Sequence, residues 1–223
     1  MSKQILVVAP HPDDETLGCG GTLLRHKAEG ESIHWLIMTE MKSECDFPVS
    51  QIEQRKIEII TVAEKYRFSS IHALGFPAVR LDTIPMNEII QKVSSVIREV
   101  TPEIIYVPYR GDIHTDHKIV FDSIISCSKW FRFDSIRRLL SYEVISETGF
   151  GLDPNVNGFK PNVFVNIDNY LEKKLEIMKV YKSELAEFPF PRSEQAIRGL
   201  AAIRGSESGC QAAEAFMLLK EIV

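Results

Sequence analysis

The stretch Ile5-Leu6-Val7-Val8-Ala9-Pro10-His11-Pro12-Asp13-Asp14-Glu15 indicates the fold of this chain. Its first five residues form an unbroken apolar run rich in β-branched side chains, which is typical of a strand buried on both faces of a parallel sheet. Pro10 and Pro12 end this strand, and a helix is predicted to begin near Glu15 and to end at Gly30.

Strand-like and helix-like segments continue to alternate along the chain. Further strands are predicted at 33–39, 71–74, 104–107, 139–144 and 163–167. Helices are predicted at 51–67, 85–100, 116–130, 168–181, 193–204 and 211–222. This order predicts an α/β fold with a Rossmann-like, doubly wound and mostly parallel sheet that carries helices on both faces. Ligands bind such sheets at the carboxyl ends of the strands.

The bulk composition predicts one domain over residues 1–223. The chain has 223 residues, of which 44% are apolar, and no linker, low-complexity stretch or repeat divides it. A formal net charge of −5 argues against a nucleic-acid partner, because such proteins usually present a basic face. The short basic pairs Arg137-Arg138 and Lys173-Lys174 are interpreted as solvated edges.

The N-terminal segment predicts neither export nor membrane insertion. Its apolar run is five residues long, whereas a secretory signal needs about 7–15 apolar residues and a membrane span about 20. No C-x-x-C pair occurs, so we expect reduced thiols in a cytoplasmic protein and poor metal ligands at the cysteines. These cysteines are Cys19, Cys45, Cys127 and Cys210.

Two loops carry side chains that could bind a metal ion or catalyse a reaction. The first, 10–15, follows the first strand, and the second, 112–117, follows the predicted strand at 104–107. Zinc in a hydrolytic site takes three nitrogen or oxygen ligands and keeps one open position for water. His11, one aspartate of the first loop and one histidine of the second would supply this set. The remaining carboxylate could then accept a proton from water, and the remaining histidine could hydrogen-bond the developing oxyanion.

Each loop also has an explanation without catalysis. The first could be a turn whose aspartates cap the next helix, and a lone His-x-x-His spacing is common on helices. The occurrence of both loops after predicted parallel strands favours a metal site. Gly18-Cys19-Gly20-Gly21 suggests a dinucleotide site, but the acidic residues 13–15 would repel a pyrophosphate, so close helix–strand packing is favoured.

The two loops resemble the PIG-L/LmbE-type deacetylase family. The matching residues are Ala9, His11-Pro12-Asp13-Asp14-Glu15 and His114-Thr115-Asp116-His117. Weaker similarities extend over nearly the whole chain: Arg55 with Glu58, Leu74-Gly75 with Asp82, and Ala213-Glu214-Ala215-Phe216. The chain departs from the family at Thr39-Glu40-Met41-Lys42, where many members carry Thr-x-Gly-Glu, so this loop does not identify the substrate.

The resemblance implies a role for each matching residue. It implies one zinc ion per chain, or another divalent metal, and a substrate with polar groups near two further side chains. The implied metal ligands are His11, Asp14 and His117. The implied catalytic residues are Asp13 as general base, His114 as oxyanion partner or general acid, and Asp116 as the residue that orients a neighbouring histidine. The implied substrate contacts are Arg55 and Asp82.

We therefore expect a zinc-dependent amidohydrolase that removes an N-acyl group, with acetyl as the expected one, from an amino sugar or sugar conjugate. Its partner is a small molecule, and a homo-oligomer is compatible with the sequence. One alternative is a Rossmann-like nucleotide-binding module without hydrolytic activity, which should purify without stoichiometric zinc. The other is a metal-dependent phosphohydrolase, which would need a denser carboxylate cluster and basic phosphate clamps.

Overall fold

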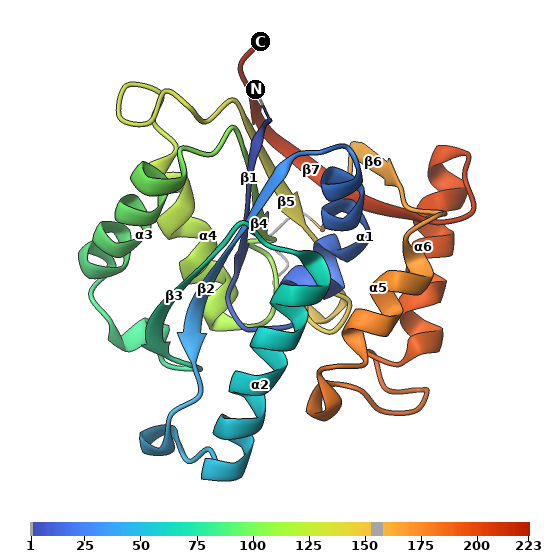
Figure 1. Cartoon of the computed structure of the whole chain (residues 1–223), viewed down its shortest axis with the longest axis horizontal. Coiled ribbons are helices and arrows are strands. Elements are labelled where there is room, and N and C mark those ends of the chain that lie inside the picture. Colours follow the sequence, from blue (N-terminus) through green and yellow to red (C-terminus); the bar gives the residue numbers. More distant parts are fainter. Residues whose placement is uncertain (1, 153–157) are drawn as a thin grey trace.

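A seven-stranded sheet in the order β3-β2-β1-β4-β5-β7-β6 runs through the computed structural model (Figure 1), which describes residues 2–152 and 158–223. The first five strands in this order pair in parallel, whereas β7 is antiparallel to both of its neighbours. The predicted α/β fold with a mostly parallel sheet is confirmed. The strands are β1 (Gln4–Ala9), β2 (Ser32–Glu40), β3 (Ser70–Pro77), β4 (Ile104–Pro108), β5 (Arg138–Tyr142), β6 (Val163–Asn166) and β7 (Ala213–Glu221).

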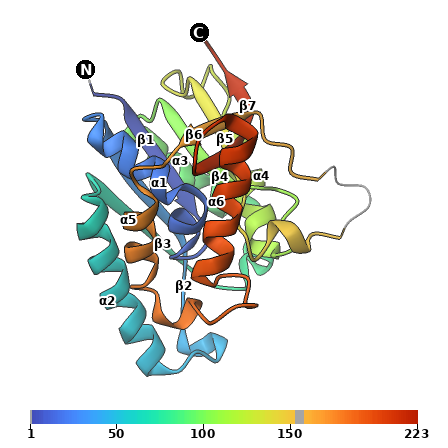
Figure 2. The ribbon, with the colours of Figure 1, turned by 90° about the vertical axis from the view of Figure 1, so that its right-hand side faces the viewer.

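Helices cover both faces of this sheet (Figures 1 and 2). They are α1 (Asp14–Ala28), α2 (Val49–Tyr66), α3 (Met86–Val100), α4 (Thr115–Cys127), α5 (Leu171–Met178) and α6 (Glu194–Ser208), with short 3₁₀ turns η1 (Ser43–Cys45), η2 (Leu81–Thr83), η3 (Thr148–Phe150) and η4 (Lys182–Glu184). None of the helices in the described part of the chain is long and apolar enough to cross a membrane.

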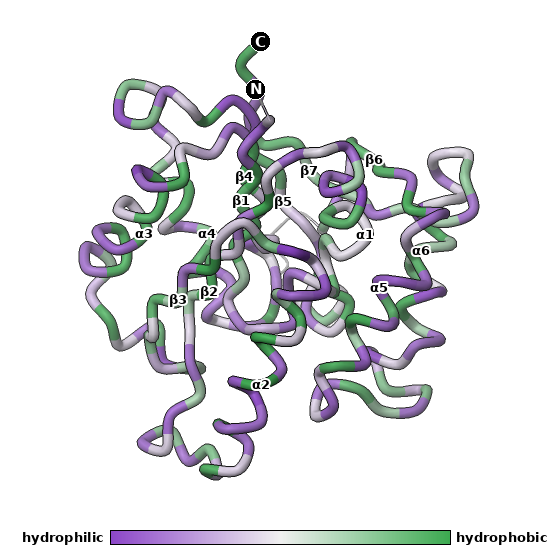
Figure 3. Tube along the Cα trace, viewed as in Figure 1, coloured by the Kyte–Doolittle hydropathy of each residue, from purple (hydrophilic) through white to green (hydrophobic). Residues whose placement is uncertain are grey.

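The unbroken apolar run of β1 is explained by its place in the middle of the sheet. Ile5 and Val7 pack into the core under α1, α2, α5 and α6, whereas Leu6 and Val8 pack into a second core under α3 and α4. Both faces of β1 are therefore buried, and the hydrophobic colouring of Figure 3 follows this central strand.

The strand order brings the two histidine loops together. β1 lies between β2 and β4, and Val7 is in register with Trp35 of β2 and Tyr106 of β4. The chain continues to β2 and β3 on one side of β1 and returns to β4 and β5 on the other. Loops that leave the carboxyl ends of β1 and β4 are thus neighbours at a topological switch point, where doubly wound sheets bind their ligands.

The predicted helix at 211–222 is wrong, because this segment forms strand β7. Its Ala, Glu, Met, Leu and Lys residues favour helix in isolation. In the fold it is inserted between two strands, and Phe216 is in register with Tyr142 on one side and Val163 on the other. Burial of residues 213–216 and pairing on both edges outweigh the helical propensity of the segment.

The expectation of a solvated edge is correct for Lys173 and wrong for Lys174. Lys174 is buried, and its Nζ lies 2.6 Å from Oε1 of Glu214 on β7. The carboxylate of Glu214 also accepts hydrogen bonds from the main-chain N–H groups of Gly21 and Thr22 at 2.9 and 2.7 Å. A buried ion pair therefore joins β7 to α5 and to the middle of α1.

The glycines of α1 allow close packing, as predicted. A Cβ atom on Gly18 would lie 2.2 Å from the ring of Tyr142, and one on Gly21 would lie 2.6 Å from Ile167. These distances are far shorter than a van der Waals contact, so larger residues would push the helix away from its neighbours.

Candidate metal centre

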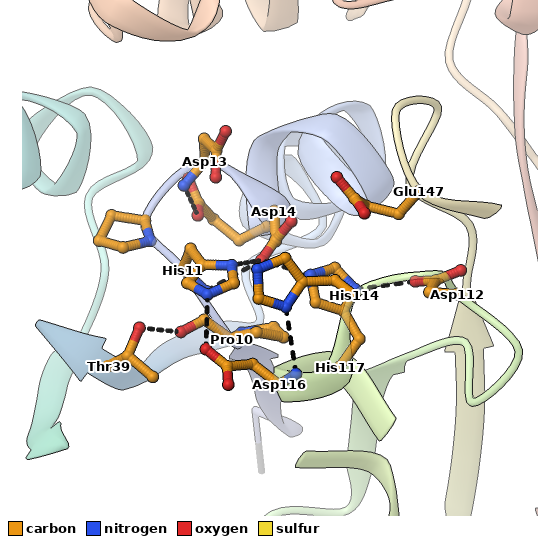
Figure 4. A network of polar contacts seen from close by, with 12 residues as sticks. Pro10, His11, Asp13, Asp14, Thr39, Asp112, His114, Asp116, His117 and Glu147 are labelled. Carbon is orange, nitrogen blue, oxygen red and sulfur yellow. Dashed lines mark hydrogen bonds and ion pairs between the residues drawn. The ribbon is translucent and has the colours of Figure 1, made fainter. Parts of the chain in front are cut away.

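The loops after β1 and β4 form the floor of a cavity of about 260 Å³. Figure 4 shows His11, Asp14, His114 and His117 converging there, with Asp13 above them and Glu147 across from them. Thr39 supports the first loop, because its hydroxyl donates to the carbonyl of Pro10 at 2.7 Å. The lining residues are His11, Pro12, Asp13, Asp14, Thr39, Met41, Phe47, Arg55, Ala78, Val79, His114, His117, Ser146, Glu147, Glu184 and Arg192.

Three side chains have the geometry of zinc ligands. Oδ2 of Asp14 lies 3.5 Å from Nδ1 of His11 and 3.4 Å from Nε2 of His117. Two ligands bound to a tetrahedral zinc ion at about 2.0–2.1 Å are about 3.4 Å apart, so this spacing fits zinc. Burial alone would raise the pKa of Asp14, but the charges and hydrogen bonds of His117 and His11 hold its pKa below the ordinary value. The carboxylate of Asp14 is therefore ionised, as a metal ligand must be.

The other ring nitrogen of each histidine is bound to a carboxylate. Nε2 of His11 lies 3.0 Å from Oδ2 of Asp116, and Nδ1 of His117 lies 2.8 Å from Oδ2 of Asp112. Both carboxylates are fully buried. An N–H donated to a carboxylate fixes the orientation of each ring, so the nitrogen near Asp14 is the one that would bind a metal.

A second group, His11 with His114 and Asp116, also brings ligand atoms close together. Its atoms are occupied, however. Oδ2 of Asp116 accepts from the main-chain N–H of Val79 at 2.8 Å as well as from His11, and its Oδ1 accepts from the N–H of Leu81 at 3.2 Å. Nδ1 of His114 accepts from the N–H of Asp116. The group with Asp14 is the better metal site, because Asp14 accepts one main-chain N–H, from His11 at 2.9 Å on Oδ2, whereas both oxygens of Asp116 accept main-chain N–H groups.

Asp13 presents a carboxylate that does not cap the helix. It is the N-cap residue of α1, but its side chain makes no capping hydrogen bond, and its carbonyl accepts from Thr16 and Leu17. The interpretation of Asp13 as a capping side chain is therefore wrong. Burial and the charge of Asp14 raise its pKa well above the ordinary value. A buried carboxylate of raised pKa beside a metal site is suited to accept a proton.

His114 presents a hydrogen-bond donor. Its Nδ1 accepts from the N–H of Asp116 at 3.1 Å, so the proton of the neutral ring is on Nε2. Burial and the nearby charges of His11 and His117 lower the pKa of His114 to about 4. The ring centroid is 4.5 Å from that of His11. A neutral imidazole with an N–H group beside the metal site is suited to stabilise an oxyanion.

Of the two predicted substrate contacts, the structure brings only Arg55 to the cavity. Arg55 is buried on α2, and its guanidinium contacts Glu58 at 3.2 Å, Ser183 at 3.1 Å, Glu184 and the carbonyl of Pro12. Asp82 is exposed in η2 and is not among the lining residues. The residues near Asp82 in sequence contact the site through their main chain instead. The N–H groups of Val79 and Leu81 donate hydrogen bonds to the carboxylate of Asp116.

Sequence reasoning assigned no role to several residues of the site. Asp112 stands at the start of the second loop, and a carboxylate five residues before His117 was the available signal. Glu147, Glu184 and Arg192 come from segments without a motif, so no local pattern could have found them. Arg192 donates to Oε2 of Glu184 at 3.1 Å, which closes one wall of the cavity.

Comparisons with known proteins agree with this geometry. The family model described as PIG-L, GlcNAc-PI de-N-acetylase, matches residues 6–128, which include all three proposed metal ligands. The diacetylchitobiose deacetylase of Thermococcus kodakarensis is 29% identical over 95% of this chain and 81% of its own length. The conserved protein TT1542 of Thermus thermophilus shares 26% identity and a TM-score of 0.77, with 99% of this chain and 96% of that chain covered. An N,N'-diacetylchitobiose deacetylase of Pyrococcus horikoshii, at 20% identity, has the same fold with a TM-score of 0.79 over 98% of this chain and 84% of its own.

Proposed function

Because the chain belongs to the PIG-L family, as its two histidine loops predicted, we propose that it is a zinc-dependent N-deacetylase of an amino sugar or sugar conjugate. The observation that carries this proposal is the triangle of His11 Nδ1, Asp14 Oδ2 and His117 Nε2, with Asp14 at 3.4–3.5 Å from each nitrogen. The relatives named for deacetylation of chitobiose support an N-acetylated sugar as the substrate.

We assign His11, Asp14 and His117 as the metal ligands, with one zinc ion per chain. When bound, zinc supplies Lewis acidity, which polarises an amide carbonyl and makes water more acidic. Asp116 and Asp112 orient the two histidines, because each accepts the N–H of the ring nitrogen remote from Asp14.

The reaction would use the two remaining residues of the loops. Asp13 accepts a proton from water as the water oxygen attacks the carbonyl carbon of the N-acetyl group. The N–H of His114 stabilises the negative charge that grows on the carbonyl oxygen. The C–N bond then breaks, and the proton held by Asp13 passes to the leaving nitrogen. The products are acetic acid and the free amino sugar, which together account for the amide and one water molecule and then ionise to acetate and an ammonium group.

The cavity supports amide hydrolysis over phosphate chemistry. Arg55 and Arg192 are the two arginines among its lining residues, and both are paired with Glu184. A phosphohydrolase would need such cations for the negative charge of its substrate. The tightly packed glycines of α1 likewise favour this reading over a nucleotide-binding module.

Four broader expectations remain proposals. Residues 1–223 are proposed to form one domain, because a single sheet includes strands from both ends of the chain. The partner is proposed to be a small N-acylated sugar rather than nucleic acid. A cytoplasmic location and any homo-oligomer stay predictions from the sequence.

The test compares the two neighbouring aspartates. The wild-type protein should purify with about one zinc per chain and release free amine from N-acetylglucosamine or diacetylchitobiose. Asp13→Asn should keep the metal and lose about 10²–10⁴-fold in kcat, the usual contribution of a general base. Asp14→Asn should lower zinc affinity, because a neutral amide replaces an anionic ligand. Loss of zinc from Asp13→Asn with retention in Asp14→Asn would reverse the two roles, and a wild-type protein without stoichiometric metal would refute the proposal.

A further inference from the structure

The backbone of Asp13 adopts a conformation that side chains rarely tolerate. Its φ is 140° and its ψ is −29°, although it is not a glycine. Such a conformation persists only where surrounding contacts hold it, and it is concentrated at functional sites. The contacts that hold Asp13 therefore decide where its carboxylate lies.

Glu15 holds the nitrogen side of Asp13. Its Oε2 accepts the main-chain N–H of Asp13 at 3.0 Å, and its side chain is fully buried. The second oxygen, Oε1, accepts from the hydroxyl of Thr16 at 2.6 Å and from the hydroxyl of Tyr181 at 2.8 Å. Both oxygens are occupied, so the carboxylate of Glu15 cannot rotate without breaking one of these bonds.

Tyr181 comes from a distant part of the chain. It lies between α5 and η4, outside the 6–128 segment that the family model matches, and it is fully buried. Besides its bond to Glu15, its ring faces the guanidinium of Arg55 at 5.3 Å. Arg55 in turn donates to the carbonyl of Pro12, the residue before Asp13. Tyr181 thus contacts both side chains that hold the backbone on either side of the Pro12–Asp13 peptide bond.

We propose that Tyr181 is the positioning residue of the general base: its hydroxyl fixes Glu15 on the N–H of Asp13, and its ring supports Arg55 on the carbonyl of Pro12. This proposal rests on the assignment of Asp13 as the base. Loss of the hydroxyl leaves Oε1 of Glu15 with one donor in a buried place, and because a lost partner of a buried acceptor costs free energy, we expect the carboxylate to turn toward another donor. Glu15 would then lose its hydrogen bond to the N–H of Asp13. The strained backbone of Asp13 would relax and move its carboxylate away from the position in which it can accept a proton from water.

The test is Tyr181→Phe, with Tyr142→Phe as the matched control. Tyr142 is also fully buried, and its hydroxyl also makes one 2.8 Å hydrogen bond, to the carbonyl of Val8. Both variants lose a buried hydroxyl and should lose similar thermal stability. Only Tyr181→Phe should lower kcat, by about 10- to 100-fold, since a displacement of about 1 Å can cost that much. KM and zinc content should stay at the wild-type values.

A double-mutant cycle separates positioning from general destabilisation. In an Asp13→Asn background the base is already absent, so Tyr181→Phe should cause little further loss of kcat. An equal fold-loss in both backgrounds would overturn the proposal, as would loss of zinc from Tyr181→Phe or an equal fall of kcat in Tyr142→Phe. Zinc content and turnover of the wild-type protein are measured first, so a failure of the proposed function is seen before any variant is compared.

Discussion

Asp112 accepts a hydrogen bond from Nδ1 of His117 over 2.8 Å, and both side chains are buried. The other oxygen of Asp112 accepts from the hydroxyl of Thr148 at 2.6 Å. The carboxylate is therefore held from two sides, and it keeps the proton of His117 on Nδ1. Nε2 of the same ring lies 3.4 Å from Oδ2 of Asp14, so it is the nitrogen that would bind a metal there.

Asp112→Asn should weaken zinc binding without removing a ligand. The amide lacks the negative charge that makes His117 a better donor, and such changes usually cost about 10- to 100-fold in metal affinity. Competition with a chromogenic chelator measures this loss. Asp122→Asn is the matched control, because Asp122 lies on α4 with His117 but is half-exposed and pairs with Arg110. Equal affinity in Asp112→Asn and the wild type would contradict this role of Asp112.

The raised pKa of Asp13 predicts the acidic limb of the pH profile. Burial and the charge of Asp14 favour the protonated carboxyl, which cannot accept a proton from water. Activity should therefore be lost as the pH falls through a value well above the ordinary pKa of an aspartate. A profile of kcat/KM against pH reports this limb for the coupled site. Activity that persists at full level down to about pH 4, the ordinary range of an exposed aspartate, would contradict the prediction.

The centre of the fold could be predicted because its pattern is local. The run 5–9 is buried on both faces, so it has no polar interruption, and the prolines that end it mark the carboxyl edge of the sheet. The residues of the metal site follow within a few positions. Residues 5–15 therefore predicted both the central strand and the first half of the metal site. The pairing of β1 with β4 brings the second loop beside the first.

The other parts of the fold and the site could not be predicted from the sequence, because they depend on contacts between distant segments. Glu184 is 129 positions from Arg55 and is joined to it by an ion pair, and no spacing in the sequence announces such a contact. The C-terminal segment was mistaken for a helix because its propensity was judged without the two strands that flank it. Asp82 carried the family similarity, yet the main chain of Val79 and Leu81 is what reaches the site.

The buried ion pair of Lys174 and Glu214 should contribute strongly to stability. Lys174→Met leaves the carboxylate of Glu214 buried without its cation, and breaking a buried pair in this way costs about 3–5 kcal/mol of unfolding free energy. Denaturant unfolding measures this change. Lys173→Met is the matched control, since its neighbour Glu176 is exposed and water screens such a surface pair, so little loss of stability is expected. Similar losses in both variants would show that burial of Lys174 has no energetic consequence.

The final prediction concerns Val79, whose φ of 58° places a β-branched residue in the left-handed region. Its side chain is 52% exposed at the cavity, so the core does not require it, whereas its N–H is needed to hold Asp116. Val79→Gly removes the clash of the Cβ atom with the backbone and keeps the N–H. Relief of strain is worth about 1–3 kcal/mol, and the greater freedom of an unfolded glycine opposes it by up to about 1 kcal/mol.

Val79→Gly should therefore raise the unfolding free energy by about 1 kcal/mol and leave zinc content unchanged. Val79→Ala is the matched control, because alanine keeps the Cβ atom and should recover little of the strain. Thermal and denaturant unfolding of both variants, with elemental analysis, make the comparison. If Val79→Gly instead lowers the unfolding free energy, packing of the isopropyl group stabilises the fold by more than the backbone strain destabilises it. Loss of zinc from this variant would instead mean that the valine side chain is required to keep Asp116 on His11.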